Sequence, residues 1–273
     1  MTAMPASLAL VGAGKMGGAM LAGWHALGLR GPGVSVFDPQ PAPEMVEFCA
    51  RAGMALNPAL PAAAPPDALV LAVKPQMLDA AAPGIQSLAG PQTLLISIIA
   101  GKTIANLQAR FPQARAIVRA MPNTPAAVGR GITGAFADQS LSPARRASAA
   151  ALLSAVGEVA WVGDERLIDA VTAVSGSGPA YVFYLTECLA RAGEAQGLPP
   201  ELAARLARVT VEGSGELMHR DATSAPAALR KNVTSPAGTT AAALEVLMAA
   251  DGMQTLMTRA VSAARRRAEE LSG

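Results

Sequence analysis

The segment at residues 8–17 reads LALVGAGKMG, an apolar run that leads directly into three closely spaced glycines. With a strand before it and a helix after it, Gly-x-Gly-x-x-Gly indicates a dinucleotide-binding loop. Gly12 permits the tight turn, Gly14 lets the backbone approach a pyrophosphate, and Gly17 lets the helix pack close to the strand. Free N–H groups and the helix dipole then meet the phosphates. The loop predicts cofactor contacts at Gly12, Ala13, Gly14, Lys15, Met16 and Gly17.

Asp38 follows the second predicted strand, about 20 residues after the glycine motif, where a Rossmann-type site has an acidic residue. Such a side chain accepts hydrogen bonds from the adenosine ribose and favours NAD over NADP. In the alternative interpretation, Asp38 only opens the Asp38-Pro39 turn. No Arg follows within several residues to hold a 2′-phosphate. The cofactor is therefore NADP or NAD, and Asp38 favours NAD.

Short β-rich runs alternate with longer helical stretches in the first half of the chain, which predicts a parallel sheet wrapped by helices. The predicted strands are residues 7–11, 34–37, 68–73, 93–97 and 116–119. The predicted helices are residues 16–29, 43–52, 77–88 and 104–111. Further strands are predicted at residues 131–137 and 158–162, on either side of a helix through residues 144–155.

The strand pattern ends near Asp164, and apolar residues then recur at helical spacing. The predicted helices of this part are residues 167–174, 179–196, 201–218 and 239–267. We therefore expect a dinucleotide-binding domain over residues 1–162 and an all-helical domain over residues 163–273. The Ala-rich helices of the second domain need one another, or a second subunit, to bury their faces.

Composition excludes several classes of protein. The chain is 51% hydrophobic and 15% charged, which excludes a disordered chain, and its net charge of +2 disfavours a nucleic-acid partner. The cluster of Arg265, Arg266 and Arg267 is interpreted as a solvated helix face. Cys49 and Cys188 show no disulfide or zinc spacing, so no metal site is expected. The apolar runs are too short to span a membrane, and no signal peptide is recognisable, so we expect a cytoplasmic protein.

Three more segments rich in turn-forming residues follow predicted strands: AVKPQ at residues 72–76, SIIAG at residues 97–101 and MPNTP at residues 121–125. The carboxyl ends of parallel strands form the ligand crevice of an open sheet, so all three segments are expected to line it. The expected cofactor contacts are Ala72, Val73, Lys74, Pro75, Ala100 and Asn123. In the alternative interpretation, Lys74 is an ordinary exposed lysine at a strand end.

The motifs GAGKMG, AVKPQ, RAMPNTP, SGSGPAYVFY and NVTSPAGTT occur in this order between residues 8 and 256. In these motifs and their spacing the chain closely resembles the pyrroline-5-carboxylate reductase family. The resemblance implies reduction of (S)-1-pyrroline-5-carboxylate to L-proline by NAD(P)H, the last step of proline biosynthesis. It also implies an α/β fold with an N-terminal Rossmann-like parallel-sheet domain and an all-α C-terminal dimerisation domain. The expected assembly is a homodimer that can form a ring of dimers, with each active site completed at the subunit interface.

The loop NVTSPAGTT carries the expected substrate site. Gly238, Thr239 and Thr240 open a predicted helix, so their N–H groups can hold the substrate carboxylate, and Ser235 can add a hydroxyl donor. The resemblance places Thr240 beside the ring nitrogen as the catalytic residue and Asn232 near the cofactor. The alternative is a helix cap, which we expect to use one of the hydroxyl groups.

The sequence differs from the family pattern at three places. The Asn that contacts the cofactor in some members falls near Ala59 here, and Asn57 is not clearly equivalent. Ala237 and Gly238 stand where Gly-Gly is usual, a change that permits the turn if Ala237 keeps a negative φ. Thr223 stands in a region that is acidic in some members, and no role is assigned to it.

Titrating side chains that could deliver a proton are scarce. His25 is expected to be structural and His219 solvated, so Thr240, water or an already protonated substrate is the simplest proton source. Two other functions compete with the reductase. A hydroxyacid dehydrogenase of the same architecture would need a catalytic Lys after the glycine turn, but Gly178 is followed by PAYVFY. A dinucleotide-responsive scaffold protein would not need the carboxylate pocket of the NVTSPAGTT loop.

Overall fold

The computed structural model describes residues 4–60 and 64–272. The chain forms two compact units. The sheet unit comprises the chain up to Ser177 together with the segment from Ala264 onward, and the helical unit comprises Gly178–Ala263. The predicted domains, residues 1–162 and 163–273, stay a prediction, because compact units do not show which residues bind the cofactor. The two compact units have different boundaries: residues 163–177 and the segment from Ala264 onward group with the sheet.

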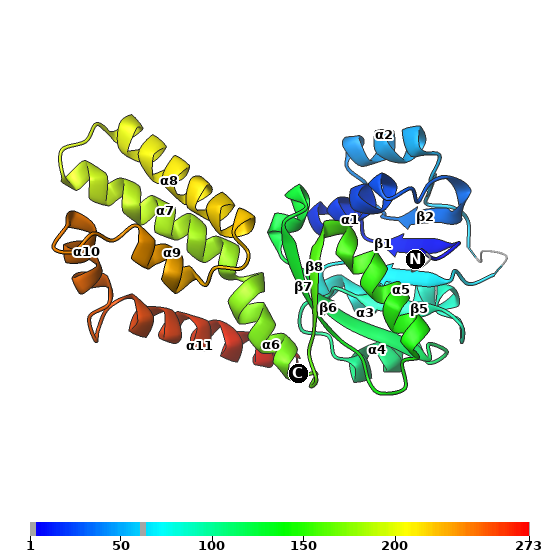
Figure 1. Ribbon diagram of the computed structural model, residues 1–273. Helices are drawn as coiled ribbons and strands as arrows, with labels where there is room; N and C mark the ends of the chain where they lie inside the picture. Colours follow the sequence, from blue (N-terminus) through cyan, green and yellow to red (C-terminus); the bar gives the residue numbers. More distant parts are fainter. Residues whose placement is uncertain (1–3, 61–63, 273) are drawn as a thin grey trace. The chain divides into compact units, whose positions relative to one another are not determined.

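An eight-stranded sheet with strand order β3-β2-β1-β4-β5-β6-β7-β8 forms the centre of the sheet unit (Figure 1). All neighbouring strands are parallel except β6 and β7, which are antiparallel. The order reverses between β1 and β4, and ligands of open α/β sheets bind at the carboxyl ends of strands beside such a switch. The strands are β1 (Leu8–Val11), β2 (Val34–Phe37), β3 (Ala55–Leu56), β4 (Ala68–Leu71), β5 (Leu94–Ser97), β6 (Ala116–Met121), β7 (Gly131–Phe136) and β8 (Gly157–Trp161).

Helices cover both faces of this sheet. Buried side chains of α1, α2 and α5 pack on one face, and those of α3 and α4 pack on the other. The α-helices of the sheet unit are α1 (Lys15–Ala26), α2 (Pro43–Ala52), α3 (Leu78–Ile85), α4 (Ile104–Arg110), α5 (Pro143–Leu153) and α6 (Leu167–Val171). The 3₁₀ turns are η1 (Gly31–Gly33), η2 (Pro75–Met77), η3 (Gln86–Leu88), η4 (Thr124–Val128) and η5 (Ser154–Val156), and η6 (Thr172–Gly176) is a π-helical turn.

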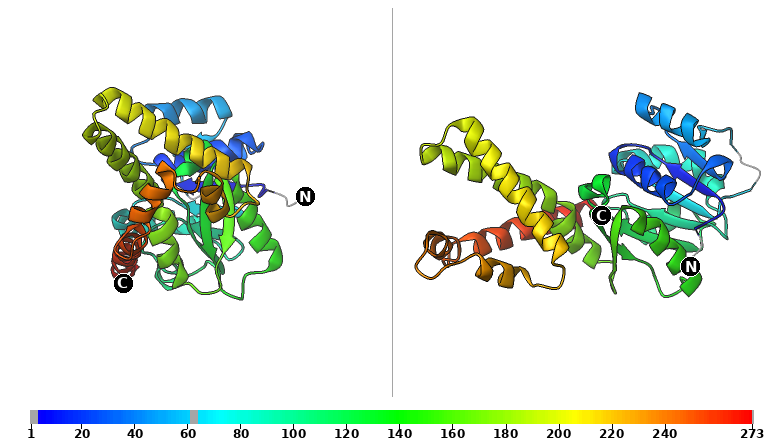
Figure 2. Two further views of the ribbon diagram at one scale, coloured as in Figure 1. Left: turned by 60° about the vertical axis from the view of Figure 1, so that its left-hand side comes forward. Right: turned by 45° about the horizontal axis from the view of Figure 1, so that its top comes forward.

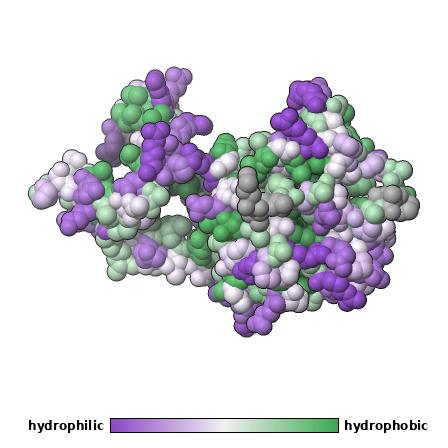
Figure 3. All heavy atoms as spheres, turned by 45° about the vertical axis from the view of Figure 1, so that its right-hand side comes forward, coloured by the Kyte–Doolittle hydropathy of each residue, from purple (hydrophilic) through white to green (hydrophobic). Residues whose placement is uncertain are grey.

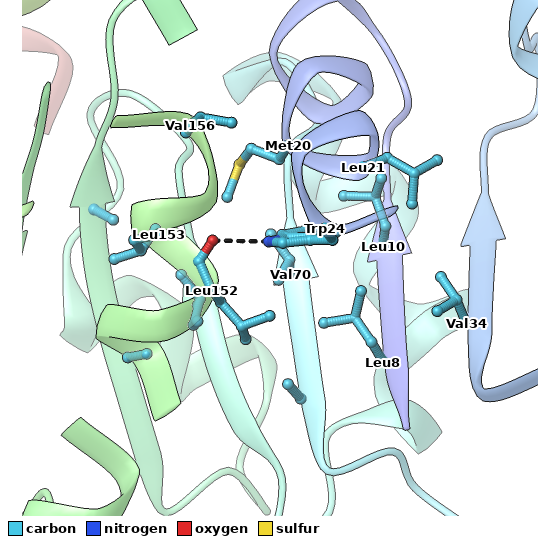
Figure 4. Packing of buried hydrophobic residues seen from close by; sticks show 14 of the residues in the cluster. Leu8, Leu10, Met20, Leu21, Trp24, Val34, Val70, Leu152, Leu153 and Val156 are labelled. Atoms are coloured by element: carbon cyan, nitrogen blue, oxygen red, sulfur yellow. Dashed lines mark hydrogen bonds between the residues drawn. The ribbon is translucent and has the colours of Figure 1, made fainter. Parts of the chain in front are cut away.

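The alternation of side chains along the strands produces the two cores. Leu8 and Leu10 of β1 point to the face covered by α1 and α5, whereas Ala9 and Val11 point to the opposite face. Trp24 of α1 is fully buried in the first core, where its Nε1–H donates to the carbonyl oxygen of Leu152 at 2.7 Å (Figure 4). The indole thus fills the core and satisfies its polar group inside it.

Every strand and helix predicted in the first half of the chain exists, with boundaries shifted by a few residues. Two features depart from the predicted parallel sheet. The two-residue edge strand β3 was not predicted, and β7 returns antiparallel to β6. Only the short turn η4 separates β6 from β7, and a parallel return needs a crossover of a dozen or so residues.

A buried arginine joins several segments of the sheet unit. Arg119 of β6 is 2% exposed, and its Nη2 lies 3.0 Å from Asp169 Oδ1 and 3.4 Å from Ser272 Oγ. Ser272 Oγ also donates to Asp169 Oδ1 at 3.0 Å. Glu165 Oε1 lies 3.4 Å from Arg119 Nη1 and accepts the N–H of Ile104 at 2.7 Å. One guanidinium therefore holds α6 and the last turn of α11 against the sheet.

The helical unit contains α7 (Gly178–Ala195), α8 (Pro200–Arg220), α9 (Pro226–Asn232), α10 (Thr239–Leu247) and most of α11 (Met253–Ser272). Helices α7 and α8 lie side by side (Figure 2). Small residues permit this approach: a Cβ on Gly193 would lie 3.3 Å from the Cβ of Ala203. The predicted helix at residues 239–267 is wrong as one piece, because the chain turns between Leu247 and Met253. Helix α9 was not predicted.

Few side chains of the helical unit are buried. Ala203 and Ala207 are its buried apolar residues, and apolar (green) surface is visible beside hydrophilic (purple) surface (Figure 3). The large exposed apolar side chains include Phe183, Tyr184, Val209, Leu217, Val246 and Leu256. Exposed apolar surface of this extent marks an association surface. No helix in residues 4–60 and 64–272 is long and apolar enough to cross a membrane.

Candidate active site

The glycine loop has the geometry that its sequence predicts. Gly12 has φ +92°, and a Cβ on it would lie 2.8 Å from the backbone of Ala72. A Cβ on Gly17 would lie 2.1 Å from the carbonyl oxygen of Gly12, so helix α1 approaches the loop as closely as glycine allows. A Cβ on Gly14 would meet no atom within 4 Å. The space above Gly14 is thus open to a ligand, as a pyrophosphate site requires.

The N-terminus of α1 is free to receive an anion. Gly14 is its N-cap and provides no side-chain cap, and the first turn has no acidic residue. The first bond back to the loop is the N–H of Gly18 to the carbonyl oxygen of Gly14, at 2.7 Å. The preceding N–H groups, on Lys15, Met16 and Gly17, are therefore the donors that a helix N-terminus presents to phosphate.

The Asp38 carboxylate contacts the same loop. Its Oδ2 accepts the N–H of Ala13 at 2.8 Å, and its Oδ1 accepts the N–H of Gln40 at 2.9 Å. Asp38 thus opens a turn, as the alternative interpretation expects, and also holds the glycine loop. Each carboxylate oxygen still has a lone pair for a ribose hydroxyl. The main-chain N–H of Ala13 is already used, which leaves its other atoms for any cofactor contact.

The remaining cofactor candidates of the sheet unit follow neighbouring parallel strands. Residues 72–75 follow β4, Ala100 lies beyond the end of β5, and Asn123 follows β6. Lys74 is exposed. Asn123 is 9% exposed, and its Oδ1 accepts the N–H of Ile132 at 2.9 Å. The fold therefore brings these candidates to the edge of the sheet that carries the glycine loop.

The loop of the helical unit leads into α10 with an open N-terminus. Asn232 is the last residue of α9, and Gly238 is the N-cap of α10, with no side-chain cap. The expectation that capping uses one hydroxyl is wrong, because the N-cap residue is a glycine. Thr239 and Thr240 are exposed in the first turn. The main-chain N–H groups of this turn are therefore free for an anion.

Ala237 has a left-handed backbone conformation. Its φ is +55°, so the condition of a negative φ, under which alanine was expected to permit the turn, is not met. The turn before α10 needs this conformation, which glycine adopts without strain and alanine does not. Alanine at position 237, where glycine is usual, therefore keeps the shape of the turn but adds backbone strain next to the predicted substrate site.

Comparison with known proteins assigns the family. Residues 165–271 match the family model for pyrroline-5-carboxylate reductase dimerisation, and residues 7–101 match that for the coenzyme F420-dependent NADP oxidoreductase. The chain is 40% identical to the pyrroline-5-carboxylate reductase of Pseudomonas aeruginosa over 97% of its own length and 96% of that protein. The chain belongs to the pyrroline-5-carboxylate reductase family.

Solved structures of the pyrroline-5-carboxylate reductase family share this fold. The enzyme of Coxiella burnetii is 33% identical with a TM-score of 0.88, over 98% of this chain and 99% of that one. The enzyme of Plasmodium falciparum, solved with NADP bound, is 27% identical with a TM-score of 0.78 over 99% of this chain and 100% of that one. The predicted Rossmann-like sheet domain and all-helical C-terminal domain are confirmed.

The predicted activity of the chain is confirmed with the family. The protein is an oxidoreductase of proline biosynthesis that reduces pyrroline-5-carboxylate to proline with NAD(P)H. The two competing functions, a hydroxyacid dehydrogenase and a dinucleotide-responsive scaffold protein, are therefore excluded. A dimerisation region over residues 165–271 accords with the exposed apolar helices and with self-association.

Two residues with structural roles, Asn57 and Arg119, were not predicted from the sequence. Asn57, left without a role, bonds both backbone groups of Asp38. Arg119 was not singled out, although an arginine between Val118 and Ala120 in a buried strand is an available signal. The cluster of Arg265 to Arg267 has the predicted solvated character, because Arg265 and Arg267 form exposed ion pairs with Glu269 and Glu270.

Proposed function

We propose that the residues of the two loops divide the reduction of (S)-1-pyrroline-5-carboxylate between them. The dinucleotide is bound and oriented by the glycine loop, Asp38, the segment at residues 72–75, Ala100 and Asn123. Asn232 is a further cofactor contact. When bound, NAD(P)H supplies the hydride. The open N-terminus of α1 supports this assignment, because it offers unpaired N–H groups beside open space above Gly14.

The substrate carboxylate binds at the N-terminus of α10. Thr239 and Thr240 present main-chain N–H groups there, and Ser235 adds a hydroxyl donor. Gly238 lines the site as the N-cap, with its own N–H donated to the carbonyl oxygen of Ser235 at 3.1 Å. The hydroxyl of Thr240 hydrogen-bonds to the ring nitrogen and orients the imine carbon toward the hydride donor. The single observation that carries this proposal is the N-cap of α10, a glycine without a side-chain cap, so no cap competes with a bound anion.

Replacement of Thr240 tests the catalytic role. Thr240→Ala is expected to lower turnover about 100-fold, because one polarising hydrogen bond to the reacting group is lost. Thr240→Ser keeps the hydroxyl and is expected to keep most of the turnover. Thr258→Ala removes an exposed hydroxyl of α11 and serves as the matched control. Oxidation of NADH and NADPH in the presence of pyrroline-5-carboxylate measures the rate, and wild-type turnover in Thr240→Ala would contradict the assignment.

We also propose that the helical units of two chains form a homodimer that can assemble into a ring of dimers, with each active site completed at the subunit interface. The exposed apolar helices support the association. Light scattering during size-exclusion chromatography measures the mass of the assembly, and a monomer at all concentrations would contradict it. A cytoplasmic location is part of the proposal, with free Cys49 and Cys188 in accord, and cell fractionation tests it.

A further inference from the structure

We propose that the loop after β2, held in place by Asn57, makes this reductase select NADH over NADPH, with Asn57 as a positioning residue for Asp38. The inference rests on the proposed function, in which the adenosine ribose binds beside Asp38. It concerns the 2′ position of that ribose, which carries a hydroxyl in NADH and a phosphate in NADPH.

The loop after Asp38 has few donors for a phosphate. Its sequence from residue 39 to residue 43 is Pro-Gln-Pro-Ala-Pro, and proline has no N–H. The N–H of Gln40 is already donated to Asp38 Oδ1 at 2.9 Å, which leaves Ala42 as the remaining main-chain donor. No side chain of this segment is positively charged, and Glu44 follows in the first turn of α2. A 2′-phosphate would meet neither a cation nor a set of N–H groups in this loop.

The carboxylate of Asp38 is fixed where the ribose is expected. Two N–H groups, from Ala13 and Gln40, hold one oxygen each. A ribose 2′-hydroxyl can donate to such an acceptor, whereas a 2′-phosphate brings a second negative charge close to it.

Asn57 fixes the backbone of Asp38 from the other side. Its Oδ1 accepts the N–H of Asp38 at 2.9 Å, and its Nδ2 donates to the carbonyl oxygen of Asp38 at 2.7 Å. The main-chain N–H of Asn57 donates to the carbonyl oxygen of Val36 in β2 at 2.7 Å. Asn57 has φ +49°, a conformation that asparagine tolerates better than most residues. The side chain of Asn57 thus fixes the main chain of Asp38, the residue expected to face the ribose, through two hydrogen bonds.

Two cations nearby oppose this selection. Lys15 and Arg51 line a hollow between the glycine loop and α2, together with Glu44, Met45 and Phe48. Arg51 lies in the last turn of α2, and Lys15 is the first residue of α1 beside the expected pyrophosphate. We expect that the positive charges of Lys15 and Arg51 do not offset the repulsion between Asp38 and a 2′-phosphate. A measurement of nucleotide binding tests this.

The test is a fluorescence titration of the full-length protein with NADH and with NADPH. The wild-type protein is expected to bind NADH at least about ten-fold more tightly. Asn57→Gly removes both side-chain bonds but suits the positive φ, so the fold is kept. Its preference for NADH is expected to fall at least about three-fold, mainly through weaker NADH binding. Gln86→Ala removes an exposed amide bond to the carbonyl oxygen of Arg110, and as the control it is expected to keep the preference.

Equal or tighter binding of NADPH by the wild-type protein would overturn the inference, as would an unchanged preference in Asn57→Gly. An equal loss of affinity for both nucleotides in Asn57→Gly would also overturn it, because a general loop defect explains that result. If circular dichroism shows that Asn57→Gly is unfolded, Asn57→Ser replaces it. This variant keeps an oxygen that can accept the Asp38 N–H and loses the Nδ2 donor without adding a charge, so a smaller fall in preference is expected, and no fall overturns the role of Asn57.

The binding readout separates this inference from the proposed function. If the nucleotides bind with the expected preference but pyrroline-5-carboxylate is not reduced, the proposed residue roles fail and the selection by the loop stands. If the imine is reduced and NADPH is the better ligand, the residue roles stand and the selection fails.

Discussion

The sheet unit and the helical unit bury their apolar residues to very different extents. In the sheet unit, Trp24 and Phe111 are fully buried in cores on opposite faces of the sheet. In the helical unit the buried apolar residues are Ala203 and Ala207, while Phe183 and Leu217 are each 65% exposed. Both units are rich in alanine and poor in aromatic residues, so composition does not explain the contrast.

The difference shows where each unit obtains its stability. A sheet covered on both faces removes large apolar side chains from water within one chain. A helix pair held together by alanine and glycine removes little apolar area, so the outer faces need another surface. The first unit is therefore expected to fold by its own core, and the second to gain most of its stability from a second copy.

Removal of the buried indole gives the largest expected effect. Trp24→Ala is expected to lower the free energy of unfolding by about 3–5 kcal/mol, because it leaves a cavity and an unpaired carbonyl oxygen at Leu152. Trp161→Ala is the matched control at the half-buried tryptophan, which stacks on Arg146, with an expected loss of about 1–2 kcal/mol. Guanidinium unfolding followed by circular dichroism measures both. Equal losses would remove the contrast between core and surface in the sheet unit.

A charge on the apolar face of the helical unit is expected to act on association instead of on the fold. Leu217→Asp on α8 is expected to weaken self-association at least about ten-fold, because the buried charge of the complex would be unpaired. Gly215→Asp, on the opposite side of the same helix, is the control for added charge, since a Cβ there would meet no atom within 4 Å. Sedimentation velocity over a range of concentrations reports the mass. Unchanged association in Leu217→Asp would mean that this face of α8 is not covered by a second copy.

Backbone strain before α10 predicts a smaller effect of opposite sign. Ala237→Gly is expected to stabilise the protein by about 1 kcal/mol, since its φ of +55° suits glycine. Ala243→Gly, inside α10, makes the same chemical change at a helical position and is expected to destabilise by about 1 kcal/mol. Thermal unfolding of the two variants compares them. If both changes destabilise, the strain at Ala237 is not a significant cost.

The smallest effect is expected at the exposed surface of the sheet unit. The hydrogen bond from Arg166 lowers the pKa of Asp164 to about 2. Because the folded-state pKa lies below the unfolded value of about 3.9, the stabilisation is present above about pH 4 and is lost as the pH falls through about 2. Asp164→Asn is expected to lower the melting temperature by under about 2 °C near neutral pH, with no difference at the acid end. Glu158→Gln is the control, and a difference that persists in acid would contradict the pairing.

Local patterns predicted most of the fold. The alternation of strands and helices up to residue 162 is encoded in short segments, and the sequence determines it locally. The break between α10 and α11 was missed because apolar spacing continues through it. A Cβ on Gly252 would lie 2.5 Å from the carbonyl oxygen of Leu247, a close approach that periodicity does not report. Helix α9 was missed because seven residues are too few for a clear helical period.

The residues of the candidate site likewise differ in how far they could be predicted from the sequence. The glycine loop could be predicted because its requirements lie within six residues. The pair of Asn57 and Asp38 is separated by 19 residues, and Arg119 and Asp169 by 50 residues, so no local pattern connects them. The conformation of Ala237 could not be predicted either, because an alanine gives no sign of a positive φ until the turn around it is known.

The partners of Arg119 have a consequence for synthesis of the chain. The strand that carries Arg119 leaves the ribosome early, Asp169 follows 50 residues later, and Ser272, in the last turn of α11, follows 153 residues later. An unpaired guanidinium in an apolar interior is costly, so Arg119 is buried only once Asp169 has been synthesised, and the contact with Ser272 is added later. The helical unit is by then fully synthesised. The N-terminal unit therefore matures only once the segment with the exposed apolar helices exists.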